Sequence, residues 1–489
     1  MTTNGIEIRS IDYIPLAERH GKAWHLGAVW LMGTASIGSV AIGLIGIASG
    51  ANLFWTLVGI VLGSMFGTFF SAFHSTQGPQ LGLPQMVQSR PQFGYRGAVL
   101  VWVLVLISYV GYNAFAGLLA GESIAVLAGG SARGWAPVVT ITALLLAVAG
   151  YDLIHRWSRW LGGIFLVIYL TFTAAALFTL DLPAGALDPG NFLLTPFLVQ
   201  FTVSAGYLIS WAPYVSDYSR YLPSTVGVKA SFLWTYLGMA LSGIWLLSLG
   251  ALIGQAFPEA GVIDAVRAAG DTVFPGFGAI VLLVALPGGL IVMALNIYGG
   301  SLTLLTIVDS VKPVRPTRAT RVIAVVSVAA AGLALVYAVS DSFLADFGTF
   351  LVFLLYFFGP WTAINLVDFY VVRKGHYSIR EIFNPHGLYG SWNWRGIGAY
   401  LIGFAATIPF QSTSIYTGSI ATAMNDVDLA AYVGIAVAGL VYWLLARGLD
   451  LEAEQRIILQ ADADLEVIAA EHLNPAPEFT SVKALNHSA

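Results

Sequence analysis

Cysteine is absent from this sequence, and charge is scarce. No cysteine occurs among the 489 residues, which excludes disulfides, thiolate metal sites and a cysteine nucleophile. Charged residues make up 10% of the chain, against about 25% in soluble domains, while 57% are hydrophobic. The net charge of −4 and the lack of a basic tract argue against a nucleic-acid partner. With a mean hydropathy of +0.78, the composition is that of a polytopic membrane protein.

Catalytic motifs are missing as well. The chain contains no paired carboxylates at catalytic spacing, no HExxH, no GxSxG and no phosphate loop GxxxxGK[ST]. These absences disfavour a membrane enzyme and an ATP-driven pump, and we expect neither a cofactor nor a metal site. The polar N-terminal stretch lacks the apolar core and cleavage site of a signal peptide. We therefore expect the helices themselves to direct insertion.

Long apolar runs are what the sequence does have. A membrane-spanning helix needs about 20 mostly apolar residues. Twelve such stretches begin near residues 26, 54, 96, 135, 160, 195, 229, 272, 319, 342, 394 and 428. If the N-terminus is inside, 20 of the 22 Lys and Arg residues are cytoplasmic and only Arg133 and Arg267 are outside, as the positive-inside rule requires. We therefore expect a multi-pass protein of a cell membrane, with both termini cytoplasmic.

Two of these stretches are interrupted by small and hydroxyl residues. The first contains GTASIGS (residues 33–39) and the sixth contains SAGYLISWAP (residues 204–213). Broken helices in corresponding positions, five helices apart, are typical of inverted-repeat transporters that bind substrate near the bilayer midplane. Close packing of helices through small residues is the alternative explanation.

Several polar and aromatic residues lie inside the predicted spans. Tyr109 and Asn113 are four apart and therefore share one face of the third helix. The sixth helix contributes Trp211 and the eighth contributes Asn296. A lone asparagine in a membrane helix is more often structural. Two amides with two aromatics suit a flat heterocycle, because rings stack on its faces, at about 1–3 kcal/mol per base, and amides pair with its edge.

Two carboxylates are candidates for a proton carrier or a gate. Glu122 lies about 13 Å beyond Asn113 along the third helix. An intramembrane carboxylate can carry a proton, although one that reaches the outer interface can instead cap a neighbouring helix. Asp217 falls with Arg220 at the inner end of the sixth helix. An ion pair or a gate is a better expectation there than a substrate contact.

Six segments, taken together in their order and spacing, carry a family resemblance. They are IEIRSIDYIPLAERHG, GPQLGLPQMVQSRPQFGYRG, the Tyr109 to Asn113 pair, SWAPYVSDYSRYLP, ALNIYGGS and GLYGSWNWRG. From about residue 6 to residue 448 the chain resembles the nucleobase:cation symporter-1 family, specifically its purine/cytosine permease branch. The resemblance implies an all-α integral membrane fold of twelve transmembrane helices, with a LeuT-like 5+5 inverted repeat and two C-terminal helices.

The resemblance also implies an organisation along the chain. We expect a cytoplasmic segment at 1–25, a first repeat at 26–180, a second, inverted repeat at 195–372, helices 11 and 12 at 393–448, and a cytoplasmic tail at 449–489. In the family, such proteins take up nucleobases or related ring compounds together with protons or sodium. We expect an importer of cytosine or a purine, with the lipid bilayer as its other partner, and no protein partner is inferred.

Site residues follow from the resemblance position by position. The family's stacking aromatic of the third helix is usually Trp, and Tyr stands in its place here. The residues assigned to substrate binding are Tyr109, Asn113, Trp211, Asn296 and Ser36, with Tyr207 as the alternative to Trp211.

The coupling ion is predicted from one departure from the family pattern. Sodium-coupled relatives place adjacent hydroxyl residues about one and a half turns before the asparagine of the eighth helix. Leu290 and Ile291 stand there in this chain, and they offer no side-chain oxygen to a hard cation. We therefore expect proton coupling rather than sodium coupling, with Glu122 and Asp217 as candidate carriers.

Alternative functions remain open. Within the same fold, the substrate could be allantoin, hydantoin or a vitamin precursor. A heterocycle-binding channel or receptor without coupled transport belongs to another class, and accumulation of substrate against a gradient distinguishes it from a transporter. A membrane enzyme is the weakest alternative, and recovery of unchanged substrate inside vesicles would exclude it.

Overall fold

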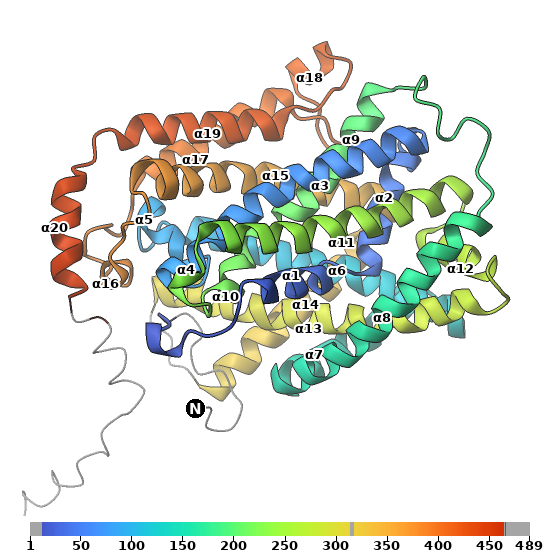
Figure 1. Ribbon diagram of the computed structural model, residues 1–489, viewed down its shortest axis with the longest axis horizontal. Coiled ribbons are helices and arrows are strands. Elements are labelled where there is room, and N and C mark those ends of the chain that lie inside the picture. The colour runs from blue at the N-terminus through green and yellow to red at the C-terminus, as the bar shows by residue number, and fades with distance from the viewer. Residues whose placement is uncertain (1–11, 150, 313–316, 464, 466–489) are drawn as a thin grey trace, which may run out of the picture.

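The computed structural model describes residues 12–149, 151–312, 317–463 and 465. Within these ranges the chain is helical, and the one extended contact is an isolated bridge between Ser412 and Thr417. Figure 1 shows long helices packed side by side, with α20 lying crosswise at one end of the bundle. The predicted N-terminal segment and C-terminal tail lie partly outside the described residues, at 1–11, 464 and 466–489.

The helices have the following bounds. They are α1 (Trp24–Gly33), α2 (Ile37–Ala48), α3 (Leu53–Ser75), α4 (Gln77–Leu81), α5 (Arg90–Phe93), α6 (Val99–Ala128), α7 (Ala132–Ala149), α8 (Tyr151–Thr179), α9 (Leu194–Ile209), α10 (Val215–Ser219), α11 (Val228–Ala256), α12 (Val262–Asp271), α13 (Phe277–Val311), α14 (Arg318–Ala338), α15 (Phe343–Leu366), the π-helical turn η5 (Val367–Val372), α16 (Ile379–Ile382), α17 (Trp394–Thr407), α18 (Ser419–Ala423), α19 (Ala430–Ala446) and α20 (Leu451–Ala461).

Each of the twelve predicted stretches coincides with one of these helices. Seven helices of the described chain are long and apolar enough to cross a membrane, or up to nine if each of two bent pairs is one span. Others are short: α17 has 14 residues, about 21 Å at the helical rise, against a hydrocarbon core of about 30 Å. Helix length and composition therefore establish a multi-pass protein, and twelve spans remain a prediction.

The first predicted helix is broken, as its small residues indicated. Its two halves, α1 and α2, meet at 66° between Gly33 and Ile37. The break frees the carbonyl of Thr34, which accepts hydrogen bonds from the hydroxyls of Ser39 at 2.6 Å and Tyr207 at 2.8 Å. Non-helical backbone at membrane depth is tolerated only where the protein satisfies its polar groups. Ser39 and Tyr207 meet this requirement.

The sixth predicted helix is broken at the predicted place too. Helix α9 ends at Ile209 and α10 begins at Val215, with a single 3-10 turn between them. Pro213 lies in that turn, where its missing N–H and its ring interrupt helical hydrogen bonding. Thus both breaks predicted from the sequence are present.

Small residues also have the packing role considered as the alternative. Helices α2 and α11 approach so closely that a Cβ at Gly43 would lie 1.9 Å from the carbonyl oxygen of Leu247. Reciprocally, a Cβ at Gly250 would lie 1.9 Å from the carbonyl oxygen of Val40. The two explanations hold at different positions, because residues 33–39 form a break and Gly43 forms a contact between backbones.

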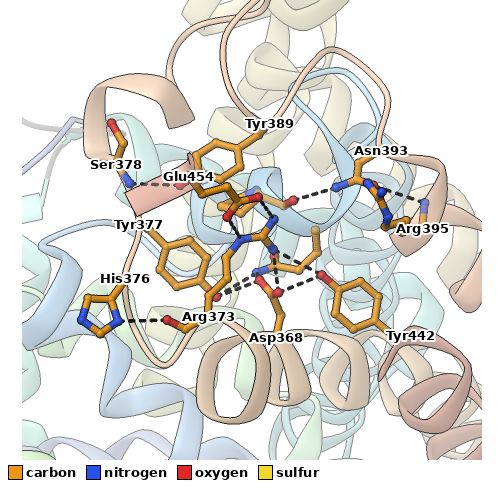
Figure 2. Close-up of polar contacts among 12 residues, drawn as sticks. Asp368, Arg373, His376, Tyr377, Ser378, Tyr389, Asn393, Arg395, Tyr442 and Glu454 are labelled. Atoms are coloured by element: carbon orange, nitrogen blue, oxygen red, sulfur yellow. Dashed lines mark hydrogen bonds and ion pairs between the residues drawn. The ribbon is translucent and has the colours of Figure 1, made fainter. Parts of the chain in front are cut away.

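A buried ion cluster attaches α20 to the end of η5 (Figure 2). Arg373 lies 2.6 Å from an oxygen of Asp368 and holds both oxygens of Glu454, at 2.9 and 3.0 Å. The hydroxyls of Tyr377 and Tyr442 each donate to Asp368 at 2.8 Å. Burial, and then the Asp368 carboxylate, raise the pKa of Tyr377 well above its usual value, so it remains a donor. The beginning of the predicted tail is therefore docked on the bundle.

Candidate functional site

A cavity lies where the breaks between α1 and α2 and between α9 and α10 face the middle of α6 and α13. The cavity has a volume of about 80 Å³. This is room for several water molecules at about 10–15 Å³ each. Its walls are mainly apolar and aromatic, with a few hydroxyl groups and one amide. This is the composition of a small-molecule site, in which a few polar groups orient the ligand.

The end of α9 and the break after it supply three aromatic rings to the cavity wall. Tyr207, Trp211 and Tyr214 all line it. The ring of Trp211 is 6.3 Å from each of the other two, at nearly perpendicular angles of 80° and 78°. Trp211 also packs edge-on against Trp30 at 5.8 Å. The structure therefore places both Trp211 and its predicted alternative Tyr207 at the cavity.

Ser36 and Asn296 also line the cavity. Ser36 is the N-cap of α2, and its hydroxyl accepts a long hydrogen bond of 3.4 Å from the backbone N–H of Ser39. The amide of Asn296 is half-buried, and within the described ranges it makes no hydrogen bond. It offers two donors and an acceptor that a ligand could use.

Helix α6 turns a different face toward the cavity than the one that carries Tyr109 and Asn113. Helix α6 presents Tyr112, Phe115, Leu119 and Ser123 to the cavity, a spacing of three and four residues that marks one helical face. Asn113 lies about 100° around the helix from Tyr112, because each residue turns an α-helix by that angle. Neither Tyr109 nor Asn113 lines the cavity.

Tyr109 instead forms a layer beneath the cavity. Its ring is 4.9 Å from that of Tyr214, and its hydroxyl packs on α13, where a Cβ at Gly299 would lie 2.4 Å from it. Asn113 faces α14, and its Cβ lies 3.1 Å from where a Cβ at Gly332 would be. Its amide nitrogen and oxygen are buried, with no hydrogen-bond partner in the part of the chain that is described.

The two predicted carboxylates are away from the cavity. Glu122 lies beside the start of α12, where a Cβ at Gly261 would be 3.3 Å from its Oε1. A carboxylate near a helix N-terminus is favoured by the helix dipole, in line with the structural alternative. Asp217 on α10 accepts a hydrogen bond of 2.9 Å from the backbone N–H of Gln85, which ties α10 to the loop after α4. A proton-carrying role for either residue remains a prediction.

The two positions at which sodium-coupled relatives carry hydroxyl residues also have apolar surroundings. Leu290 and Ile291 pack against a buried cluster that contains Met293 and Val139. Across the described ranges, no group of three or more His, Asp or Glu side chains is arranged to hold a metal ion.

Several cavity residues were missed by the sequence analysis. Tyr112, Phe115 and Tyr214 line the cavity, as does Phe347 from α15, whose ring lies 4.8 Å from that of Phe115. The sequence did contain a pattern that indicates the cavity-facing side of α6. Ala116 and Ala120 stand four apart, beside Tyr112 and Phe115, and such small side chains would leave room for a ligand.

Comparison with known proteins shows the family of the chain. The sequence profile of a family described as permeases for cytosine/purines, uracil, thiamine and allantoin matches residues 13–434. The chain belongs to this permease family. Its members are transporters rather than enzymes.

Individual relatives of the permease extend over nearly its whole length. YxlA of Bacillus subtilis, provisionally named a purine-cytosine permease, is 36% identical over 453 residues, which cover 90% of this chain and 96% of YxlA. The purine-cytosine permease fcyB of Emericella nidulans is 26% identical over 473 residues, covering 90% and 88%. Mhp1, a nucleobase-cation-symport-1 family transporter solved in a closed conformation with bromovinylhydantoin bound, matches with a TM-score of 0.70 at 18% identity, covering 92% and 98%. The likeness to Mhp1 shows the fold.

Proposed function

We propose that this permease is a secondary active importer of nucleobases, with cytosine or a purine as its substrate. The single observation that carries the proposal is the cavity beside the two helix breaks, which is lined by six aromatic residues and the amide of Asn296. The printed names of YxlA and fcyB support the substrate class. The bromovinylhydantoin of Mhp1 favours a hydantoin-like ring as the second candidate.

The cavity suggests how a base would be held. Its faces would stack on Trp211 and the neighbouring tyrosines, a contribution of about 1–3 kcal/mol that is nearly blind to the identity of the base. Discrimination would then come from Asn296 and Ser36, because a polar site rejects analogues that leave its groups unpaired. In this scheme Tyr109 and Asn113 support the floor and flank of the cavity rather than touch the base.

Proton coupling is the second part of the proposal. Leu290 and Ile291 offer no side-chain oxygen to sodium, and Glu122 and Asp217 remain the candidate carriers. The proposal also includes twelve spans, a 5+5 inverted repeat over 26–180 and 195–372, a cell-membrane location and cytoplasmic termini. The positive-inside distribution supports this orientation.

Uptake into proteoliposomes tests the proposal directly. Labelled cytosine should accumulate under an imposed proton gradient, and unlabelled adenine, hypoxanthine, uracil, allantoin and hydantoin serve as competitors. A requirement for sodium would overturn proton coupling. If verified proteoliposomes accumulated neither labelled cytosine nor, in parallel assays, labelled adenine, hypoxanthine or uracil, nucleobase import would be overturned.

A pair of variants links that uptake to the cavity. Asn296→Ala should lower the affinity for the base by about 10-fold or more, as expected when one polar contact is left unmade. Asn191→Ala, on an exposed loop, is the matched control and should transport normally. Equal uptake by both variants would move the binding site away from α13.

A further inference from the structure

Two hydrogen bonds cross between α6 and the break that separates α9 from α10. In the first, the hydroxyl of Tyr112 on α6 lies 2.6 Å from the hydroxyl of Ser210 in the break. Ser210 donates its own proton to the carbonyl of Tyr207 at 2.6 Å. Because a serine hydroxyl has one proton to donate, Ser210 must accept from Tyr112. This bond therefore runs from the long helix to the break.

The second hydrogen bond runs in the opposite direction. The hydroxyl of Tyr214, at the end of the break, lies 2.6 Å from that of Ser108 on α6. Ser108 donates to the carbonyl of Val105 at 2.7 Å, so it must accept from Tyr214. We call the contact between α6 and this break the seam. Each side of the seam supplies one tyrosine and one serine. We call these four residues, Ser108, Tyr112, Ser210 and Tyr214, the tyrosine–serine latch.

The latch lies across one end of the cavity. Tyr112 is the cavity-lining residue of α6 nearest the start of that helix, and Ser108 lies one turn closer to the start. Ser108 is 0% exposed and Ser210 is 1% exposed, so both serine hydroxyls are buried away from the outer surface. The ring of Tyr109, packed on Tyr214 at 4.9 Å, adds a second layer. The same end of the bundle carries α4, α5 and α16 (Figure 1).

The two sides of the seam differ in rigidity. Helix α6 is one continuous helix of 30 residues, whereas residues 210–214 lack α-helical structure. A break of this kind lets the two half-helices pivot, which a continuous helix resists. Opening the cavity at this end requires α6 and the break to separate. Both latch bonds must then be lost, because each spans the seam.

We propose that the tyrosine–serine latch is the inner gate of this permease, and that the cavity opens to the cytoplasm when both of its hydrogen bonds break. The inference rests on the proposed import function and on the cytoplasmic placement of the N-terminus. The latch residues act by positioning the two elements, and the structure described here is closed on this side.

Deleting the latch hydroxyls should favour the inward-open state. One lost hydroxyl should raise inward exposure of the cavity by about 2- to 13-fold, the equivalent of one net hydrogen bond. If the two bonds act independently, loss of both should raise it by about 5- to 160-fold.

The natural absence of cysteine makes this measurable. Ala116→Cys places a single thiol on the cavity lining. Its labelling by a membrane-impermeant thiol reagent is timed in inside-out vesicles, without substrate, in this background and with Tyr112→Phe, Tyr214→Phe or both. We expect faster labelling in each variant and the fastest in the double variant. Ser108→Ala and Ser210→Ala form a second set that deletes the acceptors, should a Phe variant fail to fold.

A matched control separates gating from general loosening. Tyr169→Phe on α8 also removes a buried hydroxyl, one that has no partner in the described part of the chain, and should leave labelling unchanged. The gate proposal would be refuted if labelling were unchanged in both the Tyr→Phe and the Ser→Ala variants. An equal rise in labelling with Tyr169→Phe would refute it too. Because the assay uses no substrate, a failed latch leaves nucleobase import standing, and failed uptake leaves the latch standing.

Discussion

Replacing Asp368 by alanine should destabilise the protein more than replacing Glu454, although both carboxylates bind the same arginine. The difference lies in burial and in the number of bonds (Figure 2). The side chain of Asp368 is 0% exposed, that of Arg373 2%, and that of Glu454 12%. Asp368 accepts from Arg373, from two tyrosines and from Gln92 at 2.7 Å, whereas among the described residues Glu454 accepts from Arg373 alone.

These contacts set the expected magnitudes. Asp368→Ala removes one partner of a fully buried ion pair, a change that costs about 3–5 kcal/mol of unfolding free energy. Glu454→Ala leaves Arg373 paired with Asp368. It also lets water reach the guanidinium from the side that Glu454 covers. The loss of its charged hydrogen bonds should therefore cost about 1.5–3 kcal/mol. Glu452→Ala, on the exposed face of the same helix α20, should change stability by less than about 0.5 kcal/mol.

Equilibrium unfolding in mixed detergent micelles, followed by tryptophan fluorescence, measures the three variants side by side. The expected order of destabilisation is Asp368→Ala, then Glu454→Ala, then Glu452→Ala. If Glu454→Ala cost as much as Asp368→Ala, the assignment of the central role to Asp368 would be refuted. If both cost less than about 1 kcal/mol, the cluster would not stabilise the end of η5.

Three further predictions concern the cavity and the helix contacts. Trp211→Ala should weaken binding of the base by about 5- to 150-fold, the equivalent of one lost stacking contact, whereas Trp211→Phe should retain most of the affinity; competition uptake measures both. Gly299→Ala should destabilise by about 1–3 kcal/mol through overpacking against the Tyr109 hydroxyl, and Tyr109→Phe in the same chain should restore part of the loss in thermal unfolding. Gly43→Ala meets a backbone carbonyl at 1.9 Å and should fold poorly by fluorescence-detected size exclusion, whereas Gly288→Ala, with no neighbour within 4 Å, should fold normally.

Sequence alone predicted the helices and the breaks because both depend on local properties. A span requires a run of apolar residues, and each of the twelve runs coincides with a helix of the structure. The interruption near Pro213 follows from a missing N–H. The one at residues 33–39 follows from glycines, whose backbone freedom disfavours a helix, and from Ser and Thr hydroxyls, which compete for nearby backbone groups. Ser36, Tyr207 and Trp211 were assigned to substrate binding through the family resemblance. In the structure Ser36 and Trp211 lie within these breaks, and Tyr207 lies in the last turn of α9.

The face of α6 could not be predicted in this way. Tyr109 and Asn113 stand out in the sequence as polar residues in an apolar run, but that contrast does not tell which neighbour they face. The rotation of α6 is set by its packing on α13 and α14, where Gly299 and Gly332 leave room for these two side chains. As a result Tyr112, one residue before Asn113, faces the cavity instead.

The amino-acid sequence by itself determined that this protein is a multi-pass helical membrane protein with two broken helices, because apolar runs and helix-breaking residues act locally along the chain. Tertiary structure alone decided which side chains meet across the seam between α6 and the break of the sixth helix. Tyr112 and Ser210 are 98 residues apart and Ser108 and Tyr214 are 106 apart. Such pairs form only when the packing of whole helices brings two hydroxyls within hydrogen-bonding distance, and no local pattern records that distance.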